Sequence, residues 1–361
     1  MATETFANAK RSKNDEFYTQ YTDIEQEVNA YLEYNPNVFK GKTILLPCDD
    51  PEWSNFTKYF AQNFTKFELK KLISTSYAPE SNPWKGNYQP TIFEASSPLF
   101  DEKKTRSNGK IFTLENDGTT NHDKVDYNDL KFDYLFGDGD FRSDEVKALR
   151  DESDIIITNP PFSLFRTFVP WVMEANKQFL IISNMNAITY KEIFPLIMEN
   201  KMWMGKAFGR DFKGFIIPDS YPLSGSEARI DEEGNRIVST NNTIWFTNLD
   251  HGRRHQPLAL MTMEDNLKFS KHKAIRGKTK YGTYDNFEAI EVPFTDAIPS
   301  DYDGLMGVPI SFLHKYSPEQ FEIVGCSYDY GRPTFFDKSV KMSVSVNGEN
   351  IYKRILIRHK K

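Results

Sequence analysis

The sequence predicts an α/β protein built on a doubly wound sheet, and three features of the pattern support that prediction. Several short apolar runs are almost continuously hydrophobic, which is typical of parallel strands buried on both faces. Segments with a helical pattern alternate with these runs through the first two-thirds of the chain. Strands that alternate with helices indicate a parallel sheet with helices on its faces.

The elements of this sheet are expected in the first 200 residues. Strands are predicted at 42–47, 70–75, 131–141, 154–159 and 177–183. Helices are predicted between them, at 22–35, 55–67, 143–152 and 165–176. Thr22 with Glu25, and Ser143 before an apolar helical pattern, match the capping signals of helix N-termini.

Two later parts of the chain depart from this alternation. The segment 78–130 is polar, and we expect an elaborated connection there, with a hairpin as one option. After about residue 200 the pattern favours antiparallel strands, at 214–218, 235–240, 242–249 and 351–359, with a turn at 231–235. We therefore predict a division into 1–200 and 201–361.

Composition bounds the class of protein. The chain has 361 residues, of which 39% are hydrophobic, enough for a substantial core. Two cysteines, Cys48 and Cys326, do not make a disulfide framework and suit a reducing compartment. No apolar run reaches the ~20 residues that span a bilayer, and the N-terminus lacks a signal-peptide core. We expect a soluble, cytoplasmic protein that does not bind a membrane.

The charge of the chain is unevenly distributed. The net charge is -6 and the pI is about 5.7, which does not by itself favour nucleic acid. However, 266–281 holds six Lys/Arg and no acid, and 351–361 holds five Lys/Arg and no acid. The run "HGRRH" at 251–255 is also basic. Locally basic surfaces bind phosphates on acidic proteins, while solvated loops remain the alternative for each run.

The stretch "DIIITNPPF", residues 154–162, points to specific chemistry because it ends a buried strand in two prolines. Ligands of parallel sheets bind beyond the carboxyl ends of the strands. Pro160 and Pro161 have no N–H donor and stiffen the loop, so that its carbonyl groups are available as acceptors. The Asn159 side chain adds an acceptor and Phe162 adds an apolar face. The alternative is a proline-rich turn with a buried phenylalanine.

Such a loop suits an aromatic amine as the reacting group. The lone pair of an exocyclic amine of adenine is delocalised into the ring, which makes the nitrogen a poor nucleophile. Two acceptors, the Asn159 side chain and the Pro160 carbonyl, would favour a more tetrahedral nitrogen by holding its two hydrogens. Phe162 would stack on the base, which in a duplex must first leave the helix.

Several further motifs, taken together, make the chain resemble one known family. Asn-Pro-Pro-Phe after a hydrophobic strand is similar to the catalytic motif of amino-methyltransferases. The combination with five further stretches resembles the EcoRI-type adenine-specific DNA methylases, over roughly residues 10–330. These stretches are "KNDEFYTQYTDIE" (13–25), "CDDPEWSNFTKYFAQNF" (48–64) with "LKKLIST", "GDGDFRSDE" before the catalytic loop, and "MGVPISFLHKYSPEQFEIVG" (306–325).

The resemblance implies a Rossmann-like methyltransferase sheet, S-adenosyl-L-methionine as cofactor, and roles for the motif residues. The catalytic loop that holds the target base would be Asn159, Pro160, Pro161 and Phe162. Cofactor-binding residues would be Asp15, Glu16, Phe17, Tyr18 and Thr19 near the methionine part, Pro47, Cys48, Asp49 and Asp50 in the main loop, and Asp140 and Phe141 around the adenine. Carboxylates and aromatic faces attract a sulfonium cation, which agrees with this set.

Two departures from the wider methyltransferase pattern concern the cofactor. The glycine-rich "FxGxG" is absent after the first strand, and "LLPCDDP" stands in its place. The second strand does not end in an acid that would hold the ribose hydroxyls, which leaves Tyr77 and Glu94 as candidates. The six histidines are scattered and the cysteines lack zinc spacing, so we expect no metal site. His251 with His255 is the alternative pair.

The prediction for function is a site-specific DNA adenine N6-methyltransferase in a restriction-modification, orphan or phage/mobile-element setting. The predicted partners are double-stranded DNA and a possible cognate restriction endonuclease, and the predicted oligomeric state is a monomer. Residues 1–200 would form the catalytic core, and 201–361 would complete the sheet and carry DNA-recognition loops. The candidates for DNA contacts are Lys201, Lys206, Arg210, Lys213 and 251–281, and Trp203 is expected in the core or on DNA. The alternatives are a methyltransferase for RNA adenine or protein glutamine, and an inactive DNA-binding relative.

Overall fold

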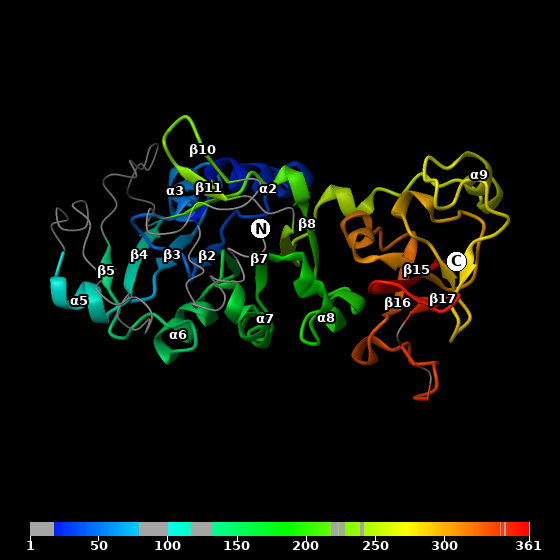
Figure 1. The fold of residues 1–361 in the computed structure, drawn as a ribbon. Helices are drawn as coiled ribbons and strands as arrows, with labels where there is room; N and C mark the ends of the chain where they lie inside the picture. Colours follow the sequence, from blue (N-terminus) through cyan, green and yellow to red (C-terminus); the bar gives the residue numbers. More distant parts are fainter. Residues whose placement is uncertain are drawn as a thin grey trace. The chain divides into compact units, whose positions relative to one another are not determined.

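The computed structural model divides the chain into two compact units (Figure 1). Unit 1 contains Met1–Ala187 and Gly205–Asp250, and unit 2 contains Ile188–Met204 and His251–Lys361. The structure describes residues 18–78, 100–116, 132–217, 223, 228–238, 242–339, 341–342 and 344–360. The division that we predict at residue 200 separates the catalytic core from the part with the DNA-recognition loops. It is a division of function, which the two compact units do not test, so it stays a prediction.

An eight-stranded mixed sheet has the order β5-β4-β3-β2-β6-β7-β12-β8. Its four central strands are parallel, and they are β3 (Lys71–Thr75), β2 (Thr43–Leu46), β6 (Ile155–Thr158) and β7 (Gln178–Asn184). The flanking strands β4 (Lys110–Glu115) and β12 (Thr243–Thr247) are antiparallel to β3 and β7. The outer strands are β5 (Asp133–Tyr134) and β8 (Trp203–Phe208). The mixed α/β architecture with a parallel core is thus confirmed.

Helices lie on both faces of this sheet (Figure 1). In that view α2 (Tyr21–Tyr34) and α3 (Asn55–Gln62) lie on one side, and α6 (Asp144–Glu152) and α7 (Phe165–Glu174) on the other. Every residue of β2 and β6 is buried, as expected for strands covered on both faces.

The core forms because alternate residues of each strand point to opposite faces. Ile44 and Ile155 pack in one cluster with residues of α2 and α3, including Ile24 and Phe56. Leu45 is equally buried but belongs to the other face. The near-continuous apolar runs in the sequence have this cause.

The strands β2 and β6 are also joined by polar groups where they begin. The backbone N–H of Thr43 donates to the Asp154 carboxylate (2.8 Å), and the backbone N–H of Asp154 donates to the Thr43 carbonyl (2.8 Å). Asp154 therefore sets the register of the two central strands, whose order in the sheet reverses between them: β3 lies beyond β2 on one side and β7 beyond β6 on the other.

Most predicted elements of unit 1 are present, with two exceptions. The run 131–141 yields only the two-residue β5, and glycines and acids replace the apolar pattern after Phe136. The capping signal at Thr22 is wrong, since Gln20 is the N-cap of α2 and its side chain makes no capping bond. Ser143 is confirmed as a cap, because its hydroxyl accepts from the Val146 N–H (3.3 Å). The described part of 78–130 contains α5 (Glu102–Ser107) and β4, which pairs with β5.

A second sheet of unit 1 contains the antiparallel strands expected after residue 200. Its order is β1-β9-β11-β10, with bounds Tyr18–Thr19, Phe215–Ile216, Arg236–Val238 and Ala228–Ile230. The predicted turn at 231–235 is confirmed, since the Asp231 N–H donates to the Asn235 carbonyl (3.0 Å). The segment predicted at 242–249 forms β12 and joins the central sheet instead.

Unit 2 is built on a five-stranded sheet of order β13-β14-β15-β19-β16. Its strands are Gly282–Thr283, Ile290–Glu291, Met306–Pro309, Arg354–His359 and Phe321–Cys326. Unit 2 also contains a strand pair, β17 (Ser345–Val346) with β18 (Glu349–Asn350), and the helices α8 (Phe194–Met198) and α9 (Met263–Phe269). Short 3-10 helices lie at Gly252–His255, Thr295–Ala297, Ile310–Lys315 and Asp329–Gly331. In the described parts of the chain, no helix combines the length and the apolar character needed to cross a membrane.

Glu27 joins α2 to β8 inside unit 1. Its buried carboxylate accepts from the Lys206 N–H (2.8 Å), the Ala207 N–H (2.7 Å) and the Tyr31 hydroxyl (2.8 Å). Gly205 is required beside it, because a Cβ there would collide with the Glu27 carboxylate. One buried acid thus supplies the hydrogen-bond acceptor for two backbone N–H groups of β8.

We expect Glu27→Ala to lower the free energy of unfolding by about 2–5 kcal/mol, because two buried N–H groups lose their acceptor. Glu33→Ala on the exposed side of the same helix is the matched control, with an expected change within about 0.5 kcal/mol. Urea unfolding followed by circular dichroism measures both. Equal effects of the two substitutions would contradict the role of Glu27.

Candidate active site

The candidate site lies at the carboxyl ends of β2 and β6, where the strand order reverses. Ligands of open α/β sheets bind at such a point because the loops diverge from it. The loop Pro47–Asp50 leaves β2 here, and the loop Asn159–Phe162 leaves β6. The two segments, more than 100 residues apart in sequence, therefore start side by side.

The Asp49 carboxylate connects these two loops. One oxygen accepts from the Ser54 hydroxyl (2.7 Å), and the other accepts from the Thr158 hydroxyl. The backbone N–H of Asn159 also donates to this carboxylate. Since Thr158 ends β6 and Asn159 begins the catalytic loop, Asp49 fixes the start of that loop relative to the loop after β2.

The environment of Asp49 changes its acidity. Burial raises the pKa of Asp49 to about 6, because an ionised carboxylate loses its hydration there, while the bonds from Thr158, Ser54 and the Asn159 N–H oppose the rise. Burial likewise raises the pKa of the neighbouring Cys48 thiol, and the negative charge of Asp49 adds to that rise. Cys48 is therefore a protonated thiol at neutral pH rather than a nucleophile.

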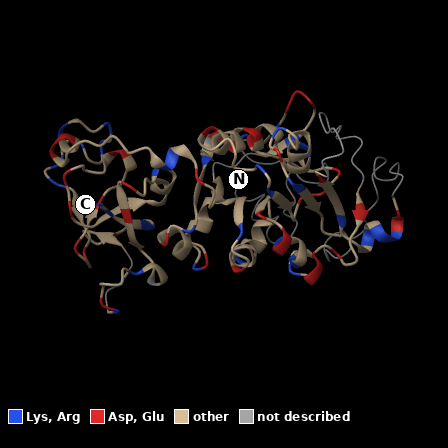
Figure 2. Cartoon of the chain, turned by 180° about the vertical axis from the view of Figure 1, so that it is seen from behind, with Lys and Arg blue, Asp and Glu red and all other residues tan. Residues whose placement is uncertain are grey.

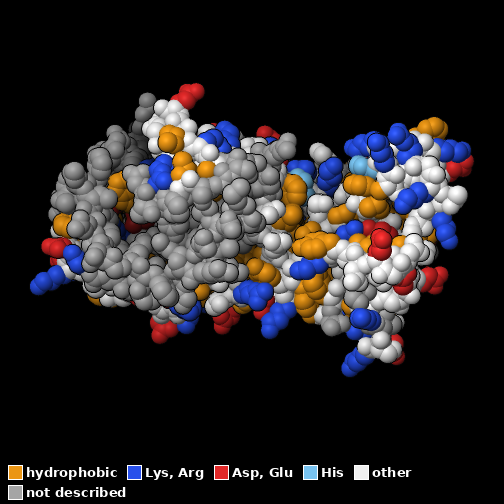
Figure 3. All heavy atoms as spheres, viewed as in Figure 1, with side chains coloured by type: hydrophobic (Ala, Val, Ile, Leu, Met, Phe, Trp, Pro, Cys, Tyr) orange, Lys and Arg blue, Asp and Glu red, His pale blue; other side chains and the backbone are white. Residues whose placement is uncertain are grey.

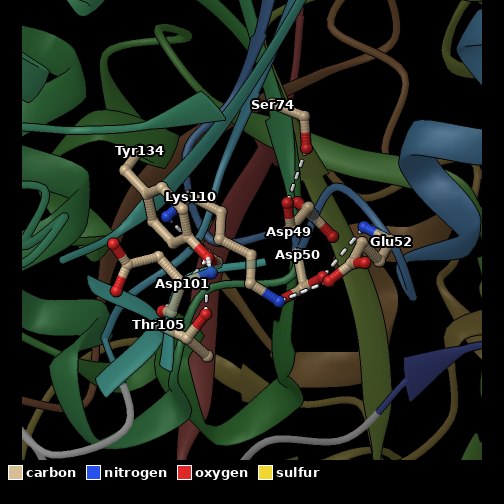
Figure 4. A network of polar contacts seen from close by, with 9 residues as sticks. Asp49, Asp50, Glu52, Ser74, Asp101, Thr105, Lys110 and Tyr134 are labelled. Carbon is tan, nitrogen blue, oxygen red and sulfur yellow. Dashed lines mark hydrogen bonds and ion pairs between the residues drawn. The ribbon is translucent and has the colours of Figure 1, made fainter. Parts of the chain in front are cut away.

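The loop after β2 is also tied to the end of β3 (Figure 4). The Asp49 N–H donates to the Thr75 carbonyl (3.0 Å), and the Ser74 hydroxyl donates to the Asp49 carbonyl (2.5 Å). The Thr75 hydroxyl donates to the Pro47 carbonyl (3.2 Å). Together these bonds define the backbone of "PCDD" without the glycine-rich sequence that is usual at this place.

A buried lysine faces the acids of the same loop. Lys110, from β4, has a side chain only 5% exposed, and its ammonium pairs with Glu52 and lies 4.0 Å from Asp50 (Figure 4). The ammonium also lies 5.0 Å from the ring centroid of Phe132. The backbone N–H of Glu52 donates to the Asp50 side chain (2.9 Å), so the two acids and the lysine form one network.

The N-terminal motif reaches the same place through β1. Asp15, Glu16 and Phe17 lie outside the described residues, whereas Tyr18 and Thr19 form β1. The Asn55 side chain at the start of α3 donates to the Thr19 carbonyl (2.8 Å). Because Asn55 follows Ser54, this bond places Thr19 near Ser54, whose hydroxyl donates to Asp49.

The catalytic loop bends quickly into a helix. Pro160 is buried, Pro161 precedes a 3-10 turn at Phe162–Leu164, and α7 follows directly. The half-buried Phe162 ring meets Phe215 of β9 edge-to-face, with centroids 6.0 Å apart. Since Phe215 pairs with Thr19 in the second sheet, that sheet supports both the catalytic loop and the N-terminal motif.

The "GDF" residues lie on a loop that packs against the end of β3. Gly139 has φ +80, and a Cβ there would collide with the Ser76 carbonyl, so only glycine allows this approach. Asp140 binds Arg142 (2.9 Å), which holds the pKa of Asp140 below its usual range. The Phe141 ring is buried against Phe168 and Trp171. The structure thus gives Phe141 a packing role, and its predicted contact with the cofactor stays a prediction.

Comparison with known proteins identifies the family of the chain. The family model described as "Adenine-specific methyltransferase EcoRI" matches residues 5–360. The chain belongs to this family. The type II methyltransferase M.EcoRI of Escherichia coli is 44% identical over 354 residues, or 98% of this chain and 95% of that protein. The type II methyltransferase M.MpnI of Mycoplasma pneumoniae is 31% identical over 364 residues, or 98% of each chain. No solved structure matches the chain significantly.

The chain is thus an adenine-specific DNA methyltransferase, as predicted, and the match covers both units. The predicted assignment of individual residues is a separate question, which the family match does not test. The structure brings Thr19, Pro47–Asp50 and Asn159–Phe162 together at one edge of the sheet through the contacts described above.

Two residues of the basic run at 251–255, His251 and Arg254, are buried rather than solvated. His251 is buried and its ring binds the Met204 carbonyl (3.0 Å), while His255 binds Glu319 (2.7 Å). Arg254 is buried, stacks on Trp203 at 3.6 Å and binds Asn200 (2.6 Å). Within the described ranges, no group of three or more His, Cys, Asp and Glu could hold a metal.

Three residues that support the site were not predicted from the sequence. Ser54 is the N-cap of α3, and its position before an apolar helical run indicates that role. Its second bond, to Asp49, has no signal in the sequence. Thr158 lies inside the motif strand without a distinguishing pattern. Lys110 carries no local signal, because its partners lie 58 and 60 positions away in sequence.

We expect Asp49 to make the stability of the protein pH-dependent. A carboxyl group whose pKa is higher in the folded than in the unfolded chain stabilises the fold at low pH, and this contribution is lost as the pH rises from about 4 through about 6. Relative to Asp49→Asn, the wild type should therefore be more stable at pH 4 than at pH 7, by about 2 kcal/mol.

Urea unfolding at a series of pH values tests this expectation. Thr158→Val is the companion variant, because losing the Thr158 hydroxyl bond raises the pKa of Asp49 further and moves the transition to higher pH. A difference between wild type and Asp49→Asn that stays constant across this pH range would refute the assignment.

Proposed function

We propose that this protein transfers a methyl group from S-adenosyl-L-methionine to the N6 amine of an adenine flipped out of duplex DNA. We also propose that it acts as a cytoplasmic monomer beside a cognate restriction endonuclease, in keeping with the type II designation of its relatives. The sheet with its reversal between β2 and β6 supports a Rossmann-like, doubly wound methyltransferase fold.

The observation that carries the proposal is the bonding of Asp49 to both Thr158 and the Asn159 N–H. It ties the loop expected to hold the methyl donor to the loop expected to hold the base. Direct transfer between two bound molecules depends on their mutual orientation, and a small displacement of either loop lowers the rate steeply. Asp49 therefore acts as a positioning residue.

The catalytic loop is suited to activate an amine. The Asn159 side-chain oxygen and the Pro160 carbonyl would accept the two N6 hydrogens, which favours the tetrahedral nitrogen of the transition state. Preorganised acceptors cost no reorganisation during the reaction, and Pro160 is fixed by burial. Phe162 would stack on the base, with its ring direction set by Phe215.

The charges at the site fit a cationic methyl donor. Among the described residues, four carboxylates lie here, Asp49, Asp50, Glu52 and Asp140, and the described cations that pair with acids of this group are Lys110 and Arg142. The excess of acids among these described side chains favours a sulfonium and an ammonium group. When bound, S-adenosyl-L-methionine supplies an electrophilic methyl group. Asp50 is the described acid best placed to hold its amino group, since both Asp49 oxygens are engaged.

The family match favours DNA over RNA or protein glutamine as the substrate. Recognition of the target sequence is proposed for the C-terminal half, 201–361. Among its basic candidates, Lys201 pairs with Glu199 (2.7 Å) and Arg254 is buried against Trp203, so that Lys206, Arg210, Lys213 and the segment 266–281 remain proposed for DNA contacts.

We expect Asn159→Ala to lower kcat by about 10²–10³-fold, because one of the two acceptors for the amine is lost. Asn159→Asp should retain more activity than Asn159→Ala, since a carboxylate oxygen still accepts a hydrogen bond. The assay measures N6-methyladenine by mass analysis after incubation with labelled S-adenosyl-L-methionine and mixed-sequence duplex DNA.

Asn37→Ala is the matched control, because Asn37 is exposed and precedes the amino end of β2, at the opposite edge of the sheet. Equal loss in both variants would overturn the assigned loop. Methyl label in RNA or protein but not in DNA would overturn the substrate. Binding of S-adenosyl-L-methionine without any methylated product would support the inactive relative.

A further inference from the structure

The basic segment 266–281, which begins within α9, contains two kinds of cation. Residues 266–281 hold six Lys/Arg and no acid. Lys268 pairs with Glu264 one helical turn earlier, and Lys271 pairs with Asp296 (2.6 Å). Both charges are neutralised within unit 2, so neither attracts a distant anion strongly.

The remaining four cations are not neutralised in this way. Lys273, Arg276, Lys278 and Lys280 are all exposed. In the described part of the chain, no carboxylate forms an ion pair with any of them. Figure 3 shows Lys and Arg side chains gathered near α9, and Figure 2 shows Lys and Arg along the loops around this helix. Four positive charges within eight residues thus face solvent together.

The backbone that carries these cations is held in one conformation. Ile275 is buried, and the N–H groups of Ile275 and Arg276 donate to the His272 carbonyl (3.0 and 2.9 Å). The Gly277 N–H donates to the Leu267 carbonyl (2.8 Å), which closes the segment onto the end of α9. Gly277 has φ +83, a conformation that favours glycine.

Both ends of the segment are anchored by aromatic or hydrogen-bonded side chains. The His272 ring stacks on Phe294 with centroids 3.7 Å apart and binds Asp296 (2.7 Å). At the far end Tyr281 is buried and its hydroxyl donates to the Ala297 carbonyl (2.7 Å). A backbone fixed at both ends loses little conformational entropy when its cations bind an anion.

We propose that Lys273, Arg276, Lys278 and Lys280 form a phosphate-contacting surface that holds the backbone of the duplex DNA substrate. This inference rests on the proposed function and deepens it. A chain with a net charge of -6 is not attracted to DNA as a whole, so its affinity must come from local clusters of unneutralised cations. Contacts of this kind position the duplex and carry no sequence information.

The test compares two double variants with equal changes in net charge. Lys278→Gln/Lys280→Gln removes two proposed phosphate contacts. Lys268→Gln/Lys271→Gln removes two neutralised cations from the same segment. Each variant changes the net charge from -6 to -8, since two positive charges are lost. Any difference between them therefore reports the position of the charge.

Binding of full-length protein to a fluorescent duplex is measured by anisotropy over a range of salt concentrations. We expect the slope of log K against log salt to become less steep by about 1.8 for Lys278→Gln/Lys280→Gln, or 0.9 for each lost contact. The slope for Lys268→Gln/Lys271→Gln should remain that of the wild type. Because phosphate contacts are independent of sequence, the change should be the same on duplexes of different sequence.

The outcomes separate this inference from the proposed function. Wild type that methylates DNA, combined with equal slopes for both double variants, would overturn the phosphate surface alone. Wild type that neither binds nor methylates duplex DNA would overturn the proposed function itself. Unchanged melting temperatures are required for both variants, and Lys273→Gln/Arg276→Gln provides a second, independent pair from the same surface.

Discussion

The site depends on one interaction, the bonding of the Asp49 carboxylate to the loops that leave β2 and β6. The ladder between these strands pairs only Ile44 with Ile155 and Leu45 with Ile156, and it ends before either loop begins. Beyond that point the backbone bonds of the sheet no longer define how the loops lie. Asp154 ties the two strands where they start, and Asp49 ties them where they end. Two aspartates, one at each end, therefore convert a short parallel ladder into a fixed distance between two functional loops.

A carboxylate in this position has a chemical consequence as well as a structural one. Burial raises the pKa of Asp49 to about 6, while three donors favour its ionised form, so at neutral pH the group is charged and bonded to both loops. That charge would also favour the cationic methyl donor that we propose. Lys110 offsets the charges of Glu52 and Asp50, with which it pairs, and lowers the repulsion between these two acids. The described part of the site therefore combines several buried or half-buried acids with a backbone fixed by hydrogen bonds.

The sequence allows the central sheet to be predicted because burial on both faces leaves a continuous apolar run, as in β2, β6 and β7. The same logic fails where an element depends on a distant partner. The run 131–141 is apolar only at its start, so its two-residue strand follows from pairing with β4 rather than from its own pattern. The basic run 251–255 suggested a solvated or DNA-binding loop, yet Arg254 is buried because Trp203 offers it a face to stack on. A local pattern contains no information about that partner.

The motif residues show the same limit at the site itself. A motif identifies residues that belong to one function. It does not distinguish residues that contact a ligand from residues that position the contacting residues. Asp49 and Asp50 are adjacent in the sequence, yet Asp49 turns inward to Ser54 and Thr158, while Asp50 is the half-buried acid next to Lys110. Phe141 and Phe162 are both motif aromatics, yet Phe141 is buried among aromatic rings and Phe162 stands at the edge of the catalytic loop. The cations of 266–281 divide likewise, into those with an internal partner and those that face solvent. In each pair, the tertiary partner decides the role.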